Sequence, residues 1–173
     1  MIITAGKYKG QKITSPDENI TRPTLSKARM GIFNTLQTMI DFEGKSFLDM
    51  YAGSGIIGLE ALSRGFEKVC SIEKNSKAVN IIKSNYKKFV SAPHLLIGDS
   101  IKIADKLQEK FDVIYIDPPY YSEIYEKSLA SVLKIAADIV IIEHVTPVNY
   151  DGYKLLKEKK YGRTIITFLN ADS

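Results

Sequence analysis

From Ser46 onward, the chain alternates short apolar runs with segments of helical periodicity, and this alternation constrains the fold more than any other feature. Runs such as 113–116 and 139–142 are apolar on both faces, as expected of parallel strands covered by helices on both sides. Strand–helix alternation with short connections predicts an α/β doubly wound fold. The expected strands are 46–50, 68–73, 94–97, 112–117 and 138–143, and the expected helices are 56–64, 76–89, 101–109 and 122–136.

The N-terminal region departs from this alternation. Residues 1–14 are expected to form a small hairpin around Gly6 and Gly10. A helix is expected after an Arg-Pro turn, with Thr24 or Ser26 as its N-cap. Apolar residues recur on one face of this helix and predict its buried stripe: Ile32, Phe33, Leu36 and Ile40.

The C-terminal region also departs from the strand–helix alternation. Residues 153–159 and 163–169 are expected to form two strands joined by a turn at Tyr161-Gly162. A closing antiparallel pair at the sheet edge gives a mixed, mostly parallel sheet of seven strands. We therefore expect a main domain over residues 41–173, with the basic hairpin and helix of residues 1–40 as an extension of the same domain.

The formal net charge of +4 is unevenly distributed along the 173 residues. Residues 1–38 hold six cations and two anions, so the rest of the chain is formally neutral. This is the pattern of a nucleic-acid contact added to a neutral domain. A lysine-rich surface that only aids solubility explains the same pattern, and charge alone does not separate the two.

The chain lacks the sequence marks of secretion or membrane insertion. A single cysteine, Cys70, cannot form an internal disulfide and lies in an apolar run, so we interpret it as a core residue. No apolar run reaches the roughly 18–20 residues of a membrane span, and the first residues do not resemble a signal peptide. We expect a cytoplasmic protein with no membrane partner.

A glycine-rich loop, Asp49-Met50-Tyr51-Ala52-Gly53-Ser54-Gly55, ends the first expected core strand. Its glycines allow a tight turn and let a ligand approach the N-terminus of the following helix. Residues 53–58 also fit the dinucleotide-binding spacing, so the loop alone is a weak signal. A P-loop is disfavoured because no Gly-Lys-Ser/Thr follows, and a tight turn without a ligand remains open.

Acidic residues follow the next two expected strands. Glu73 can accept hydrogen bonds from the ribose hydroxyls of a nucleoside cofactor, which fits NAD and S-adenosylmethionine equally. A surface glutamate beside Lys74 is the simpler alternative. Asp99, in Gly98-Asp99-Ser100, can accept a hydrogen bond from an adenine amine, act as the N-cap of the next helix, or do both.

The loop Asp117-Pro118-Pro119-Tyr120 distinguishes among the alternatives left open for the glycine-rich loop, Glu73 and Asp99. It follows the fourth strand, beside the topological switch point where doubly wound sheets bind ligands. Two prolines make a rigid loop that presents carbonyl oxygens. An acidic acceptor and a carbonyl can hold the two hydrogens of an exocyclic base amine and free its lone pair to attack a sulfonium methyl. The Tyr120 ring can stack on the base. A plain strand-terminating turn is the alternative.

Taken together, these motifs resemble those of the bacterial 16S ribosomal RNA guanine-N2 methyltransferases. The resemblance extends over nearly the whole chain. Its core motifs are shared by many amine methyltransferases, whereas the N-terminal block with its Arg-Pro-Thr turn is more specific. The segments that carry it are residues 2–10, 21–24, 33–34, 47–55, 60–65, 73–75 and 117–120, together with Arg29.

The resemblance implies a Rossmann-like class I S-adenosylmethionine-dependent methyltransferase, with 16S rRNA, in a small subunit or an assembly intermediate, as its partner. It implies a monomer without a metal. Tyr51 stands where phenylalanine is more usual, and lysine replaces arginine at several N-terminal positions, which keeps phosphate attraction but loses the planar fork. The implied cofactor residues are Asp49, Tyr51, Ala52, Gly53, Ser54, Gly55, Glu73, Lys74, Asp99 and Ser100; the implied target-base residues are Asp117, Pro118, Pro119 and Tyr120; and the implied RNA contacts are Lys7, Lys9, Lys12, Arg22, Thr24 and Arg29.

We expect direct transfer to the guanine amine without a covalent intermediate, driven by orientation and placed acceptors. His94 and His144 flank apolar strands and are interpreted as structural. Four alternatives stay open: a DNA adenine or cytosine amine methyltransferase, a protein-glutamine methyltransferase (which would usually carry Asn in place of Asp117), a nicotinamide-dependent oxidoreductase, and a silent RNA-binding module. Cofactor titration separates the last two from a methyltransferase.

Overall fold

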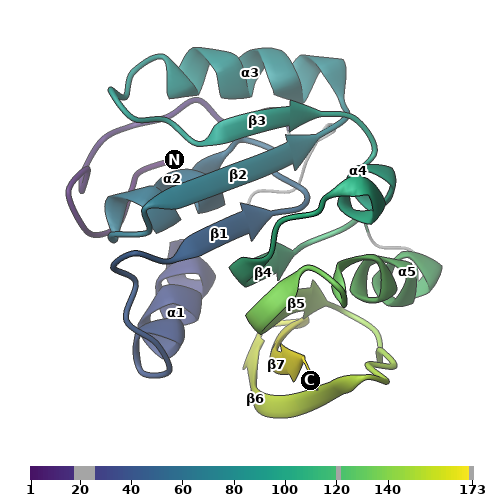
Figure 1. The fold of residues 1–173 in the computed structure, drawn as a ribbon. Helices are drawn as coiled ribbons and strands as arrows, with labels where there is room; N and C mark the ends of the chain where they lie inside the picture. Colours follow the sequence, from purple (N-terminus) through teal and green to yellow (C-terminus); the bar gives the residue numbers. More distant parts are fainter. Residues whose placement is uncertain (18–25, 120–121, 172–173) are drawn as a thin grey trace.

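The computed structural model describes residues 1–17, 26–119 and 122–171, and it contains a sheet with helices packed on both faces (Figure 1). This arrangement confirms the predicted α/β class and the mixed, mostly parallel sheet of seven strands. The elements are α1 (Ser26–Gln37), β1 (Ser46–Asp49), α2 (Ile56–Ser63), β2 (Lys68–Glu73), α3 (Ser76–Tyr86), β3 (His94–Ile97), α4 (Ser100–Lys106), β4 (Phe111–Ile116), α5 (Ser122–Val132), β5 (Ala136–His144), β6 (Tyr153–Tyr161) and β7 (Thr164–Ala171).

The strand order is β3-β2-β1-β4-β5-β7-β6. Strands β1 to β5 run parallel, whereas β7 is antiparallel to both β5 and β6. Because β1 lies between β2 and β4, the chain leaves β1 toward β2 and returns to its other side with β4. The five parallel strands therefore end at one side of the sheet, here called the carboxyl edge, and the topological switch point lies there between β1 and β4.

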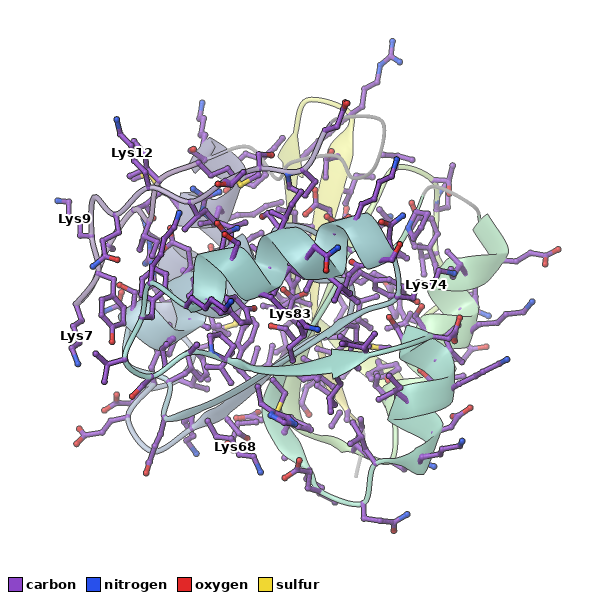
Figure 2. All side chains as sticks on the ribbon, turned by 90° about the horizontal axis from the view of Figure 1, so that it is seen from above. Lys7, Lys9, Lys12, Lys68, Lys74 and Lys83 are labelled. Atoms are coloured by element: carbon purple, nitrogen blue, oxygen red, sulfur yellow. The ribbon has the colours of Figure 1, made fainter. Side chains whose placement is uncertain are left out.

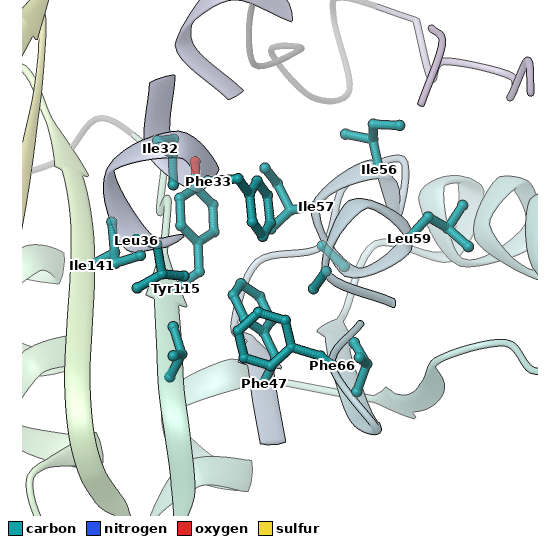
Figure 3. Packing of buried hydrophobic residues seen from close by; sticks show 14 of the residues in the cluster. Ile32, Phe33, Leu36, Phe47, Ile56, Ile57, Leu59, Phe66, Tyr115 and Ile141 are labelled. Atoms are coloured by element: carbon teal, nitrogen blue, oxygen red, sulfur yellow. The ribbon is translucent and has the colours of Figure 1, made fainter. Parts of the chain in front are cut away.

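Strands β1, β2, β4 and β5 bury side chains on both faces, which explains their apolar runs. Phe47 of β1 packs in one cluster with residues of α1, α2 and α3, whereas Leu48 packs in the other with residues of α4 and α5. Figure 3 shows Phe33 of α1 beside Phe47, with ring centroids 5.9 Å apart. Phe66 approaches Phe47 edge-on at 5.1 Å. These aromatic contacts fix α1 and α2 over β1 and so position the loop that follows β1.

Several boundaries differ from the prediction, and the helices expected over 76–89 and 101–109 end at Tyr86 and Lys106. The helix expected to reach residue 136 ends at Val132, and Ala136 already belongs to β5. The Phe111 amide donates to the Ile135 carbonyl, so the start of β4 requires extended backbone there. Ile32, Phe33 and Leu36 are buried as predicted, while Ile40 lies beyond the end of α1 and is partly buried. Thr24, one of the expected caps, lies outside the described residues.

The N-terminal segment forms a hairpin-like loop that is docked on α2 and α3. A single antiparallel bridge joins Ile2 to Lys12, and the described residues 1–17 contain no longer strand. Gly6 has a φ of 82°, and a Cβ atom there would lie 1.9 Å from the Ser63 carbonyl oxygen. The close approach and the positive φ together require glycine at this position. The Thr14 amide also donates to the Asn85 side chain at 2.8 Å.

A buried ion-pair network joins α1, α2 and this segment. The Glu60 carboxylate accepts from Arg29 Nε at 3.0 Å, from Arg64 Nε at 3.2 Å and from the Thr4 amide at 2.6 Å. Arg29 also donates to the Ile2 carbonyl at 2.7 Å. The Arg29 and Glu60 side chains are both 0% exposed. The prediction that Arg29 contacts RNA is therefore wrong, because its guanidinium is committed to the interior.

We predict that Glu60→Ala lowers the free energy of unfolding by about 3–5 kcal/mol, because it leaves the Arg29 guanidinium buried without its carboxylate. Urea denaturation of the purified variant measures this loss. Glu60→Gln retains an oxygen acceptor and should be intermediate. The exposed Glu67 provides the control, and Glu67→Ala should change stability by less than about 0.5 kcal/mol. Equal effects of Glu60→Ala and Glu67→Ala would contradict the role of the pair.

Candidate active site

The loop after β1 brings backbone amides to the carboxyl edge. Gly53 and Gly55 have φ values of 57° and 82°. Gly55 occupies the N-cap position of α2, and a Cβ atom there would lie 2.7 Å from the Tyr86 ring. Glycine is thus required at residue 55 by both backbone and packing. The first turn of α2 presents its amides and the positive end of its dipole toward this loop, which favours a negatively charged group.

Asp49, the last residue of β1, is a buried carboxylate with unusual electrostatics. It is 1% exposed, and within the described part of the chain neither of its oxygens has a hydrogen-bond partner. Burial raises the pKa of Asp49 to about 7, and the charge of Glu73 adds to the increase. The amides of Tyr51 and Gly58 oppose the increase without reaching hydrogen-bonding geometry. A buried acceptor in this state is suited to an incoming cationic donor.

Glu73, the last residue of β2, holds the loop in place. One of its oxygens accepts from the Gly53 amide at 2.9 Å. The other accepts from the amides of Lys74 at 2.9 Å and Asn75 at 2.8 Å. A carboxylate offers about four acceptor directions, so the oxygen bonded to Gly53 retains one for a ligand hydroxyl. The same residue therefore positions the loop and can bind a ribose.

The segment after β3 contributes Asp99 and Ser100. Asp99 is the N-cap of α4, accepting from the Lys102 amide at 3.1 Å, and Lys74 Nζ lies 3.9 Å from its other oxygen. Its side chain remains 41% exposed, so it can also accept from an adenine amine. Ser100 is buried, and its hydroxyl donates to the Met50 carbonyl. The structure thus gives Ser100 a part in positioning the loop after β1.

Asp117, Pro118 and Pro119 follow β4 at the switch point, and Tyr120 lies outside the described residues. Asp49 of β1 pairs with Tyr115 of β4. Asp117 lies two residues after Tyr115, just beyond the end of β4. Side chains alternate along a strand, which places Asp117 on the same face as Tyr115 and Asp49. The two acidic residues singled out in the sequence thus lie on neighbouring strands at the carboxyl edge.

Two further polar contacts at the carboxyl edge were not predicted from the sequence. Glu143, near the end of β5, is buried and accepts a hydrogen bond from the Tyr115 hydroxyl. Burial raises the pKa of Tyr125, and the charges of Asp117 and Glu143 add to the increase. The Tyr51 hydroxyl lies 2.7 Å from the Ser128 hydroxyl, which joins the loop to α5. The signal for Glu143 was an acidic residue ending the apolar run 139–142.

The predicted RNA contacts of the N-terminal segment lie elsewhere. The Lys7 amide donates to the Ser63 carbonyl at the C-terminal end of α2. That end is about 10 Å from the helix start, on the side of the sheet opposite the carboxyl edge. Figure 2 shows Lys7, Lys9 and Lys12 grouped together, far from Lys74. Arg22 and Thr24 lie outside the described residues.

The two histidines take no part in this site. His144 is buried, with its ring nitrogens 2.8 Å from the Thr146 carbonyl and from the Thr167 hydroxyl. His94 begins β3, at the other end of that strand. Among residues 1–17, 26–119 and 122–171, no three His, Cys, Asp or Glu side chains gather as a metal site. No helix in the same ranges is long and apolar enough to cross a membrane.

Known proteins match this chain along most of its length. The family described as conserved hypothetical protein 95 matches residues 1–170. YlbH of Bacillus subtilis is 31% identical over 88% of this chain and 79% of its own length. Ribosomal RNA small subunit methyltransferase D of Haemophilus influenzae is 30% identical over 92% of this chain and 88% of its own. The structure of yhhF from Escherichia coli, 23% identical, superposes with a TM-score of 0.87 over 100% of this chain and 98% of its own, which shows a shared fold.

The raised pKa of Asp49 predicts a specific pH dependence of stability. The folded protein holds the Asp49 proton up to about pH 7, whereas the unfolded chain releases it near pH 4. Ionisation therefore opposes folding increasingly as pH rises between these values. Relative to Asp49→Asn, which cannot ionise, the wild type should lose about 2–3 kcal/mol of stability between pH 5 and pH 7. Urea denaturation at the two pH values measures this difference, and parallel pH profiles for the two proteins would contradict it.

Proposed function

The chain belongs to the conserved hypothetical protein 95 family, and from this premise we propose that it transfers a methyl group from S-adenosylmethionine to the exocyclic N2 amine of a guanine in 16S rRNA. Methylation of small-subunit rRNA is supported by the names of relatives that match over most of their length. The identity of the target base as guanine and of the methylated atom as N2 is part of the proposal and is inferred from the loop Asp117–Tyr120.

The cofactor assignment rests on the unpaired carboxylate of Asp49. S-adenosylmethionine carries an ammonium group, a ribose and an adenine, and it supplies a methyl group on a sulfonium. Asp49 can pair with the ammonium, Glu73 with a ribose hydroxyl and Asp99 with the adenine amine, because each ends or follows one of three neighbouring parallel strands. The amides around Gly53 and Gly55 suit the cofactor carboxylate. The residues present therefore fit the group.

The target base is assigned to the loop after β4. The Asp117 carboxylate and the Pro118 carbonyl are suited to accept the two N–H groups of a planar amine, which orients its lone pair toward the cofactor. Pro118 is buried and Pro119 has its φ fixed by its ring, so the acceptors are held rigidly. Asp117 can also take up the proton that the amine releases as it is methylated. Stacking of the base on Tyr120 remains a prediction from the sequence.

The biological setting belongs to the same proposal. We take the substrate to be a small ribosomal subunit or an assembly intermediate, because a guanine exposed there needs no opening of a duplex. The enzyme would act as a monomer in the cytoplasm, where subunits are assembled. A DNA amine substrate would use the same acceptors, so the test identifies the methylated nucleoside directly.

We predict that Asp117→Asn lowers kcat for methyl transfer by roughly 100-fold or more, because an amide presents one acceptor in place of two and loses the charge. KM for the cofactor should stay within about twofold, since Asp117 lies at the base site. The assay uses labelled S-adenosylmethionine, small subunits that lack the modification, and nucleoside analysis of the product. Asp105→Asn on the exposed face of α4 is the matched control.

Label in N2-methylguanine, reduced by Asp117→Asn and retained in Asp105→Asn, is the expected result. Label in another nucleoside would move the proposal to that base. No transfer to subunits or free rRNA by a protein that binds the cofactor would exclude rRNA as the substrate.

A further inference from the structure

The C-terminal hairpin carries a dense run of cations that the net charge of residues 39–173 does not reveal. Residues 153–164 contain five cations and one anion, although residues 39–173 are neutral as a whole. Strand β6 forms the edge of the sheet beyond β7. Four of the five cations are exposed and the fifth, Lys159, is half-buried. We call these residues the β6 basic strip: Lys154, Lys157, Lys159, Lys160 and Arg163.

The cations of the strip are not paired with carboxylates of the described residues. Within residues 1–17, 26–119 and 122–171, none of the ion pairs with nitrogen and oxygen within 4.0 Å involves the strip. The single anion of the segment, Glu158, lies on the same face of β6 as Lys160 and accepts from the Thr167 hydroxyl at 3.3 Å, but it forms no ion pair with the strip. The strip is therefore available to an external anion.

The register of the sheet brings one end of the strip to the carboxyl edge. Lys159 pairs with Ile166, and Ile166 pairs with Glu143. Lys159 is thus level with Glu143, two strand spacings away, or about 10 Å. The turn between β6 and β7 carries Arg163 and lies at the same edge, because β6 ends where β5 ends.

Contact with α1 fixes the position of this turn. A Cβ atom at Gly31 would lie 1.8 Å from the Tyr161 hydroxyl, so α1 and the end of β6 are in close contact. Lys7 and Lys9, in contrast, lie beside the C-terminal end of α2 at the opposite edge. A nucleic acid with a base at Asp117 therefore meets the β6–β7 turn without passing around the sheet.

Resting on the proposed function, we propose that the β6 basic strip binds the sugar-phosphate backbone of the rRNA that flanks the target guanine. Lysines on an edge strand also prevent pairing with other sheets. That role does not require a cation in the turn, where Arg163 lies beyond the β6 ladder. Arg163 and Lys159 at the carboxyl edge instead match the path of a bound strand, and phosphates are the partners of such a surface.

The test compares two triple variants of equal charge. Lys157→Gln, Lys159→Gln and Lys160→Gln together remove three of the strip's five cations. Lys83→Gln, Lys106→Gln and Lys110→Gln together remove three exposed charges from α3, from the end of α4 and from the loop after α4. The probe is a small-subunit rRNA fragment that contains the target site, titrated at several KCl concentrations. Thermal melting and light scattering check folding and self-association.

The strip variant should bind the fragment with a log–log salt slope smaller by about 2, from roughly 0.7 for each of three lost phosphate contacts. Its KM for RNA should rise at least about fivefold at physiological salt, while KM for the cofactor and kcat at saturating RNA stay near wild type. Arg163→Gln, in the exposed turn, should give a slope reduction of about 0.7 with little effect on folding.

A strip variant with the same slope and KM as the control variant would overturn the inference, and self-association with unchanged RNA binding would assign the lysines to edge protection. Failure of the proposed function would give a different experimental result from failure of this inference. In that case the wild type itself transfers no methyl group to rRNA, whatever the strip variant does.

Discussion

The carboxylate of Asp49 is the group on which the arrangement of the site depends. Strand β1 is paired on both sides, by β2 and β4, so its last residue cannot leave the core. Its oxygens have no hydrogen-bond partner in the described residues, and its pKa is raised to about 7. Holding such a group costs stability. A ligand with a positively charged donor offsets that cost, which explains why the loop after β1 and the side chain of Glu73 are built around it.

The topology determines what lies beside this carboxylate. Because β1 is flanked by β2 and β4, Asp49 has Glu73 on one side and the Asp117 loop on the other. The sites proposed for the nucleoside end of the cofactor and for the target base therefore lie on opposite sides of the end of β1. The same register extends through β5 and β7 to β6, so that Lys159 is level with Glu143. One sheet edge thus carries the sites proposed for the cofactor, the base and the RNA backbone.

Much of this could be predicted from the sequence because periodicity and strand-end motifs are local. Apolar runs gave the strands, and the glycines of the loop after β1 have the positive φ values that such a turn needs. Non-local pairing could not be predicted. Arg29 is bonded to Glu60, 31 residues away, so a charge count placed a buried residue on the surface. The β6 basic strip was hidden because the anions that balance it lie elsewhere in the sequence, and Glu143 gained significance only when β5 was placed beside β4.

The most direct measurement is proton release on binding of S-adenosylhomocysteine, which shares the ammonium group with the cofactor. Isothermal titration calorimetry at pH 6.5, in two buffers of different ionisation enthalpy, counts the protons. If the ammonium pairs with Asp49, binding ionises the carboxyl group and releases roughly three-quarters of a proton, and Asp49→Asn abolishes that release. Tight binding with no proton released by the wild type would show that Asp49 does not receive the ligand.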